Sequence, residues 1–457
     1  MELKDEQVIV AQATPQGAGA IAMLRISGDR AIEIIDSICQ IPGSKKLIDQ
    51  ATHTIHYGWV IDTHGQHVDQ VLFLLMRGPK TFTGQDVVEI TCHNNQFLVE
   101  QIIDIIIRAG ARLADQGEFT RRAVLHGKVD LVQAEAINEL IHAQTTQALK
   151  QSLRQLEGSF SSWIATIEKQ LIAIIGLCEA SFEFLDEEIS FAPQIIARLD
   201  QVRADIAQVL KTFDKRQYVT QGVRIALVGS VNAGKSSLFN ALINRKRAIV
   251  TDIAGTTRDT IEAGIYGNGA FITFVDTAGL RESDDVVEKI GIDRSFDEVA
   301  SSDLILMVFD ATADYHQQEI DVYQSIATQH ASKIIFVQNK IDAGSNILPF
   351  LQKQNVVAVS VLEHTNVDQL RMKIDEKIDA LMQTGQSPCL LNKRQYSLLL
   401  LLEQELEVIK NRISIRIDYE LLVILVNDAL SKLSQLTGKT VSEQALDAIF
   451  REFCVGK

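Results

Sequence analysis

Short apolar runs of strand length alternate with segments of helical apolar spacing over the first 119 residues of the chain. This alternation predicts an N-terminal α+β domain, residues 1–119. Gly17 and Gly19 lack the third glycine of a dinucleotide-binding motif, so a plain turn is favoured there. Strands are expected at residues 8–13, 20–26, 70–76 and 87–92, and helices at residues 30–39 and 96–108.

The pattern changes at Thr120, beyond which apolar residues recur at steps of three and four over long stretches. This spacing predicts long amphipathic helices that pack on one another. The same spacing returns in residues 396–409 and 420–436. We therefore predict one discontinuous helical domain in two pieces, residues 120–216 and 381–457, since insertion of one domain into another is tolerated.

An α/β pattern occupies residues 217–380, between these pieces, and begins with a phosphate-binding motif. The apolar run 223–228 precedes GSVNAGKS, whose last residues Gly234, Lys235 and Ser236 open an amphipathic helix. The glycines let backbone N–H groups surround phosphates, the lysine neutralises the terminal phosphates, and the serine hydroxyl completes a Mg2+ shell. The sequence therefore predicts a site for a nucleoside triphosphate and Mg2+.

Three further motifs follow in the order of a guanine-nucleotide site: DTAG at 276–279, NKID at 339–342, and Ser360 after the run 356–359. Asp342 can accept hydrogen bonds from the N1–H and 2-amino groups of guanine. Adenine offers neither donor, so its binding would cost on the order of a few kcal/mol. One such motif alone is more often an ordinary turn, whereas four in order predict an inserted, Ras-like P-loop GTPase domain.

Parts of the usual hydrolysis machinery are absent from these motifs. Leu280 stands where many GTPases carry a glutamine that orients water, and no arginine finger is fixed by the sequence, although Arg258 and Arg281 lie near. A monovalent cation held by carbonyl groups and an asparagine could neutralise the charge instead.

Composition narrows the choice of partners. The 457 residues are 46% apolar and 23% charged, which is ordinary for a globular protein of about two to four domains. A net charge of -15 excludes a generally basic surface, so contact with RNA needs local patches or a second protein. The five cysteines are widely spaced, which disfavours disulfides and a zinc site. Without a targeting signal or an apolar run approaching about 18 residues, we expect a cytoplasmic protein with no membrane contact.

The whole chain resembles the MnmE (TrmE) family of bacterial tRNA-modification GTPases. Its C-terminal FCVGK is the most discriminating segment, because ordinary GTPases lack it. The other matching segments are VIVAQATPQGAGAIAMLRISG at 8–28, FTGQDVVEITCH at 82–93, GEFTRRAVLHGKVDLVQAEAI at 117–137, the phosphate-binding motif, DIAGTTRD at 252–259 and DTAGLRE at 276–282.

The resemblance implies an N-terminal folate-binding domain that also forms a homodimer. The folate would be a tetrahydrofolate one-carbon derivative, in the 5,10-methylene or 5-formyl form. It further implies an FAD-containing partner of the MnmG type, in a heterotetramer or larger complex. Together they would add an aminomethyl or carboxymethylaminomethyl group to C5 of the wobble uridine of tRNA. The implied folate ligands are Arg25, Glu89, Lys128 and Lys457.

The resemblance also assigns roles around the nucleotide. Ser236 and Thr257 would bind Mg2+, Glu288 would orient the attacking water, and Lys235 would act with them in catalysis. Cys454 is a candidate for a redox or nucleophilic part, against the plainer alternative of a small buried apolar residue. The implied K+ ligands are Asn232, Thr251, Ile253 and Thr256. The expected GTP-binding set is Asn232, Ala233, Gly234, Lys235, Ser236, Ser237, Thr251, Thr256, Thr257, Asp276, Thr277, Ala278, Gly279, Asn339, Lys340, Asp342 and Ser360.

The chain departs from the family pattern at a few positions. Val231, Gln116 and Leu185 each stand where the family carries proline. Asn94 and Asn95 replace two glycines, and if those glycines allow close approach of the backbone, this chain binds folate or its dimer partner more weakly.

The sequence therefore favours a K+-stimulated GTPase that takes part in tRNA wobble-uridine modification. The main alternative is a regulatory GTPase in ribosome assembly or RNA processing, but no appended RNA-binding domain with a GxxG loop is evident. A third possibility is a folate-dependent one-carbon transferase in which GTP is only structural.

Overall fold

The computed structural model describes residues 6–43, 45–183, 190–230, 232–243, 261–267, 269–276, 299–382, 389–415 and 418–456. The chain divides into two units, and the second is interrupted and enclosed by the first in sequence. The domain bounds after residues 119, 216 and 380 stay predictions. The first unit comprises Met1–Ile141, Leu153–Ala207 and Lys393–Lys457, and the second comprises His142–Ser152 and Gln208–Asn392.

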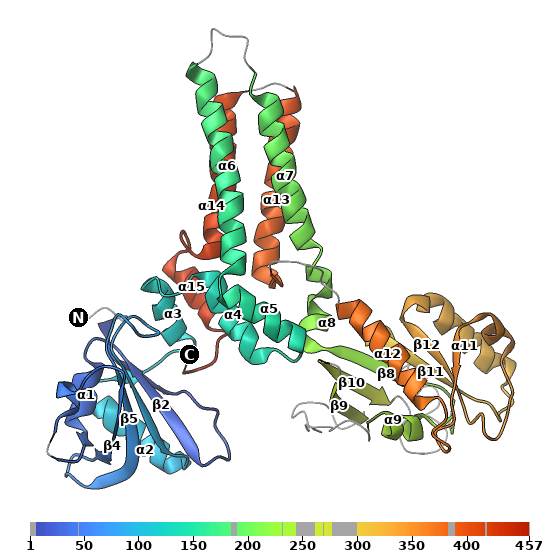
Figure 1. Ribbon diagram of the computed structural model, residues 1–457, viewed down its shortest axis with the longest axis horizontal. Coiled ribbons are helices and arrows are strands. Elements are labelled where there is room, and N and C mark those ends of the chain that lie inside the picture. The colour runs from blue at the N-terminus through green and yellow to red at the C-terminus, as the bar shows by residue number, and fades with distance from the viewer. Residues whose placement is uncertain are drawn as a thin grey trace. The chain divides into compact units, whose positions relative to one another are not determined.

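A seven-stranded sheet forms the N-terminal part of the first unit, in the order β3-β4-β5-β6-β2-β1-β7 (Figure 1). Neighbouring strands are antiparallel except β1 and β7, which are parallel. The four predicted strands are confirmed as β1, β2, β5 and β6, whereas β3, β4 and β7 were not predicted. The bounds are β1 Ile9–Gln12, β2 Ile21–Ser27, β3 Cys39–Gln40, β4 Thr54–Ile61, β5 His67–Met76, β6 Val87–His93 and β7 Arg112–Leu113.

The two predicted helices of this part are confirmed as α1, Ala31–Ser37, and α2, Gln96–Arg108. They pack on one face of the sheet, and their isoleucines join the alternate buried residues of the central strands in one apolar core. On the other face, helix α3, Glu118–Leu125, places Phe119 against Ile9 and Ala11 of β1. The two faces of the sheet therefore have different covers.

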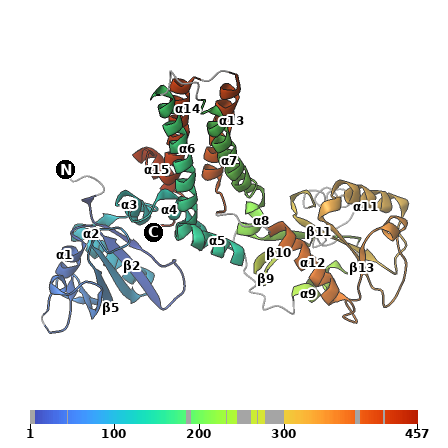
Figure 2. The same ribbon diagram turned by 45° about the horizontal axis from the view of Figure 1, so that its top comes forward.

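Long helices form the rest of the first unit. Figure 2 shows α6, Ser159–Glu183, beside α14, Tyr419–Thr437, and α7, Ala192–Leu210, beside α13, Lys393–Ile415. These four helices confirm that the helical part is built from segments that precede and follow the inserted P-loop domain in sequence. Shorter helices are α4 Leu131–His142, α5 Thr146–Leu156, which spans the division between the units, and α15 Glu443–Phe450.

One stretch of α6, Ser159–Ser181, is long and apolar enough to cross a membrane by length and composition alone. Its buried residues recur at helical spacing, as in a core helix, and a single stretch of this kind is weak evidence for a membrane span. These buried residues are Phe160, Ile164, Ile167, Leu171, Ile174 and Cys178.

The second unit is built on a six-stranded sheet in the order β13-β12-β11-β8-β10-β9. All neighbours are parallel except β9 and β10, which are antiparallel. Separate apolar clusters lie on the two faces, with α9 and α12 contributing to one and α11 to the other. The fold is therefore the expected Ras-like P-loop α/β domain, inserted in sequence into a helical domain that follows an N-terminal α+β part. The bounds are β8 Val223–Val228, β9 Ile261–Gly267, β10 Ala270–Asp276, β11 Leu304–Asp310, β12 Ile334–Asn339, β13 Val356–Ala358, α8 Arg216–Gln221, α9 Lys235–Ile243, α11 Gln317–Gln329 and α12 Val367–Met382.

Candidate functional site

The phosphate-binding loop joins the carboxyl end of β8 to the first residue of α9, Lys235. The Lys235 side chain is buried, and its Nζ donates hydrogen bonds to the carbonyls of Gly229 and Ser230, each at 2.7 Å. Gly234 has a φ of 86°, a conformation that L side chains rarely adopt. The loop thus wraps around a fixed ammonium group at a helix N-terminus, which is the arrangement that binds phosphate.

The base-side loop contacts the phosphate-binding loop directly. Asn339 ends β12, and its Nδ2 donates to the Ala233 carbonyl at 3.0 Å. A Cβ at Gly234 would lie 2.2 Å from that same Nδ2, so only glycine fits there. Asn339 Oδ1 is buried and has no hydrogen-bond partner among the residues that the structure describes. A buried acceptor without a partner is costly, which fits a loop built to complete its hydrogen bonds with a ligand.

The remaining base-side residues come together at the same end of the sheet. Ser360 is buried, its Oγ accepts from the Glu363 amide at 3.1 Å, and its backbone pairs with Thr365. The amide of Ile341 donates to Val359, which joins this turn to the NKID loop, and Asp342 is exposed. The structure therefore leaves the Asp342 carboxylate accessible to a base.

The other expected nucleotide ligands fall into two groups. Asn232, Ser236 and Ser237 are exposed in the phosphate-binding loop and the first turn of α9. Asp276 ends β10, where it pairs in parallel register with Leu227 of β8, so DTAG starts at the same edge of the sheet. The remaining members lie outside the described residues: Thr251, Ile253, Thr256, Thr257, Thr277, Ala278, Gly279 and Glu288.

A second group of expected site residues meets on the N-terminal sheet. Arg25 of β2 pairs with Glu89 of β6, with Arg25 Nε 2.8 Å from Glu89 Oε1. Arg25 Nη1 donates to the Gly456 carbonyl at 3.1 Å, and the guanidinium lies 5.8 Å from the centre of the Phe119 ring. Lys128 donates instead to the Pro79 carbonyl at 2.8 Å. The structure thus brings the C-terminal motif to Arg25 and Glu89.

The C-terminal motif is held in place by its own residues. Phe453 is buried against Phe450, and the Gly117 amide donates to the Cys454 carbonyl at 3.4 Å. Gly456 has a φ of 90°, and a Cβ there would lie 2.4 Å from the carbonyl oxygen of Gln12. Gly117 and Gly456 were not predicted as site residues, although FCVGK itself was the signal that could have found them.

Cys454 differs from the other cysteines in its exposure. Cys454 is exposed, so the alternative of a small buried apolar residue is wrong for it. Burial raises the pKa of Cys39 to about 12 and that of Cys92 and Cys178 to about 11, which makes these thiols poor nucleophiles. Lys457, the last expected folate ligand, lies outside the described residues.

The two asparagines that replace glycines have local roles. Asn95 is the N-cap of α2, with a φ of −114° and a side chain that accepts from the amides of Phe97 and Leu98. Asn94 Nδ2 donates to the Gly17 carbonyl at 2.8 Å and so closes the loop between β1 and β2. Asn95 therefore needs no left-handed backbone, and asparagine is among the best N-cap residues.

Known proteins with similar sequences cover nearly the whole chain. The family model described as the TrmE N-terminus of GTP-binding proteins matches residues 8–128, and that of the MnmE helical domain matches residues 131–454. The tRNA modification GTPase MnmE of Aquifex aeolicus is 37% identical over 454 residues, covering 98% of this chain and 99% of that protein. Its counterpart in Enterococcus faecalis is 36% identical over 460 residues, covering 98% of each chain.

Among solved structures, the G domain of the T. maritima FeoB iron transporter is 29% identical, covering 35% of this chain and 99% of that chain, with a TM-score of 0.27. That score is too low to support an argument about the fold. The matches to MnmE proteins span nearly the full length of the chain, and the structure adds the P-loop sheet and the contact of the C-terminal motif with the N-terminal sheet. The chain belongs to the MnmE (TrmE) family of tRNA modification GTPases, and is a GTP hydrolase that takes part in tRNA modification.

Proposed function

We propose that this GTPase is K+-stimulated, acts as a homodimer, and uses a tetrahydrofolate one-carbon unit to modify C5 of the tRNA wobble uridine. The modification would add an aminomethyl or carboxymethylaminomethyl group, in a complex with an MnmG-type FAD protein in the cytoplasm. The observation that carries the proposal is the contact of the Gly456 carbonyl with Arg25, beside Glu89. GTP hydrolysis alone requires no such contact, so the N-terminal sheet and the C-terminal motif have a task of their own.

The chemistry of these side chains fits a folate. A pterin ring presents an N–H and a 2-amino group on one edge. A carboxylate such as Glu89 can accept hydrogen bonds from both groups, as Asp342 would from guanine. The glutamate part of a folate is anionic and suits Arg25, Lys128 and Lys457. Arg25 and Glu89 have side chains that are 21% and 13% exposed, so both can still reach a ligand. When bound, the folate would supply the one-carbon unit, and these residues would bind and orient it.

An uncovered part of the N-terminal sheet supports the homodimer. Tyr57 of β4 and Leu72 of β5 are register partners and both are exposed, as is Ile55 two residues before Tyr57. Arg25 and Glu89 continue the same face across β6 and β2. Exposed apolar side chains gathered on one sheet face are typical of an interaction surface. A second copy of the chain that covers this face would lie next to the proposed folate site.

GTP hydrolysis is proposed to depend on K+ and on Glu288. Asn232 is exposed, so its side chain is available to a cation. The other proposed K+ ligands are Thr251, Ile253 and Thr256. K+ and Mg2+ would neutralise charge on the phosphates, with Ser236 and Thr257 holding Mg2+. Glu288 would orient the attacking water in place of the missing glutamine.

We expect Glu288→Ala to bind GTP normally but to hydrolyse it at least about 100-fold more slowly, because it removes only the group that orients water. Replacing K+ with Na+ should also lower turnover in the unchanged protein. Single-turnover phosphate release in either salt measures both effects. Equal rates for Glu288→Ala and wild type would remove the proposed role, and equal rates in the two salts would remove K+ from the site.

The tRNA reaction is tested by nucleoside mass spectrometry of bulk tRNA from cells that lack the chain. Wild type should restore a C5-aminomethylated wobble uridine, whereas Arg25→Ala and deletion of residues 453–457 should not, since each removes part of the proposed folate site. Arg108→Ala is the matched control, because Arg108 is exposed on α2. A nucleoside profile unaffected by loss of the chain would favour a regulatory GTPase in ribosome assembly. If Arg25→Ala and the deletion of residues 453–457 both restored the modified uridine to the wild-type level, the proposed folate site would be refuted, but the tRNA reaction would not.

A further inference from the structure

Asp310 lies between the two halves of the nucleotide site. It is the last residue of β11, which is flanked by β8 on one side and β12 on the other. β8 leads into the phosphate-binding loop, and β12 ends at Asn339, the register partner of Asp310. The Ala311 amide also donates to the Asn339 carbonyl at 2.9 Å. Asp310 is therefore attached to the base-side loop by its backbone neighbours as well as by its side chain.

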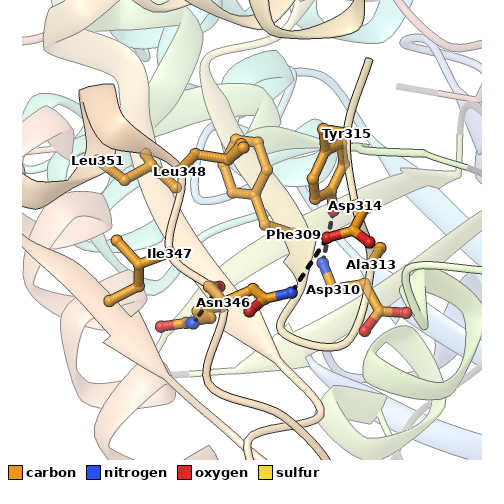
Figure 3. A pocket seen from close by; sticks show the side chains of 10 residues that line it. Phe309, Asp310, Ala313, Asp314, Tyr315, Asn346, Ile347, Leu348 and Leu351 are labelled. Carbon is orange, nitrogen blue, oxygen red and sulfur yellow. Dashed lines mark hydrogen bonds between the residues drawn. The ribbon is translucent and has the colours of Figure 1, made fainter.

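Both carboxylate oxygens of Asp310 are engaged. Oδ2 accepts from Lys340 Nζ at 2.6 Å, and Oδ1 accepts from the Thr312 amide at 2.8 Å and from Thr312 Oγ1 at 2.6 Å. The Asp310 amide donates to the Tyr315 hydroxyl at 2.7 Å, as the dashed line in Figure 3 shows. The side chain of Asp310 is only 9% exposed, so the ion pair with Lys340 is partly shielded from water. Three donors thus fix the orientation of a carboxylate that faces Lys340.

The pKa shifts of Asp310 and its neighbour Tyr315 agree with these contacts. Burial acts to raise the pKa of Asp310, but the hydrogen bonds from Lys340 and Thr312 outweigh it, so the pKa lies below its ordinary value. Burial raises the pKa of Tyr315, against hydrogen bonds with the Asp310 backbone and with the side chain of Ser230. Asp310 is therefore ionised near neutral pH, and the Tyr315 hydroxyl accepts from its backbone amide.

Lys340 has a conformation that needs support. Its φ is 63°, in the left-handed region, which costs a non-glycine residue about 1 kcal/mol or more. Its backbone is followed by a turn in which the amides of Ala343 and Gly344 donate to the Lys340 carbonyl. The ammonium group is held by Asp310, so backbone turn and ion pair together define the path of this side chain.

We propose that Asp310 is a positioning residue for guanine-nucleotide binding, acting through Lys340. The carboxylate holds the Lys340 ammonium and thereby keeps the NKID loop in the conformation that receives the base. This proposal rests on GTP binding, which belongs to the family, and does not depend on folate, K+ or tRNA.

A hollow of about 200 Å³ lies beside Asp310 and supplies a matched control (Figure 3). It is lined by Phe309 and Leu348 on its apolar side and by Asp314, whose Oδ1 accepts a long hydrogen bond of 3.4 Å from Asn346 Nδ2. Asp314 lies four residues after Asp310 and is exposed. Both aspartates line this hollow, but only Asp310 has an ion pair with Lys340 among the contacts of the described residues.

The test compares the affinity for fluorescent GDP of Asp310→Asn, Lys340→Ala, the double variant and Asp314→Asn, with the full-length chain. We expect Asp310→Asn to bind about 10-fold more weakly, because the Lys340 ammonium loses its ion pair and keeps only a hydrogen bond to an uncharged amide oxygen. The double variant should bind no more weakly than Lys340→Ala, and Asp314→Asn should match wild type.

Two outcomes would overturn the proposal. Wild-type affinity of Asp310→Asn would show that the carboxylate does not position the loop. A further loss in the double variant, of the same size as in the wild-type background, would show that Asp310 affects nucleotide binding independently of Lys340. Thermal unfolding without nucleotide is measured for each variant to show that it is folded. If Asp310→Asn fails to fold, Asp310→Glu is used instead; it keeps the negative charge and should bind GDP with close to wild-type affinity. Because the readout is GDP binding, a failure here leaves the proposed tRNA reaction untouched.

Discussion

Lys235→Ala is expected to abolish GTP binding, with a loss of affinity of at least about 100-fold. The ammonium is buried within the loop and is held by the carbonyls of Gly229 and Ser230, so it lies where bound phosphates need a positive charge. Alanine removes this charge and leaves the two carbonyls without their donor. Equilibrium titration with GTP in the presence of Mg2+ measures the effect.

The matched control for this experiment is another lysine of the same unit. Lys377 of α12 donates to the Ser332 carbonyl at 3.1 Å, so Lys377→Ala also removes a contact between a lysine and a backbone carbonyl. Its GTP affinity should equal that of wild type. Binding by Lys235→Ala within a few-fold of wild type would contradict the assignment of the loop as the phosphate site.

Arg394→Ala is expected to destabilise the first unit by about 3–5 kcal/mol, because it breaks a shielded ion pair and leaves one charge unpaired. Arg394 lies in the first turn of α13, and its Nε and Nη2 contact the two carboxylate oxygens of Glu135 in α4 at 2.6 and 2.8 Å. The same guanidinium donates to the carbonyls of Gln435 and Leu436 in the last turn of α14, each at 3.0 Å. The Glu135 side chain is only 8% exposed. In the Arg394→Ala variant it would keep the hydrogen bond from Gln395 Nε2 but lose its positively charged partner.

Urea unfolding followed by circular dichroism measures this loss. The transition of the second unit is identified by its shift when GDP is added, because a ligand stabilises the unit that binds it. Arg394→Ala should move the other transition to lower urea. Lys439→Ala is the control, since its pair with Glu168 at 3.4 Å is largely exposed and should contribute less than about 1 kcal/mol. Equal midpoints for the two variants would contradict a special role for the Arg394 pair.

The nucleotide site was largely predictable because each of its motifs is local. A run of apolar residues forms a buried strand, and the few residues after it carry the chemistry. Parallel strands then bring these ends to one edge of the sheet, as seen for the loops after β8 and β12. The helical part was predictable for a similar reason, since apolar spacing of three and four residues determines which face of each helix is buried.

Asp310 was not predictable in this way. A single aspartate at the end of the apolar run 304–309 is an ordinary strand terminus, and its partner Lys340 lies 30 residues further along the chain. The cap formed by Asn95 was not predictable either, because the sequence shows two asparagines in place of glycines and cannot show that one of them begins a helix. Whether they weaken folate binding or dimerisation stays a prediction.

The sequence by itself determined the family, the P-loop domain, the guanine specificity expected from NKID and the division of the helical part into two pieces. These features depend on neighbours along the chain, whose local chemistry and periodicity are readable without coordinates. Only the tertiary structure decided that Gly456 reaches Arg25 across 431 positions, and that Asp310 holds Lys340. Such contacts depend on strand register and on how the C-terminal residues pack, and both are settled by burial and hydrogen bonding over the whole fold.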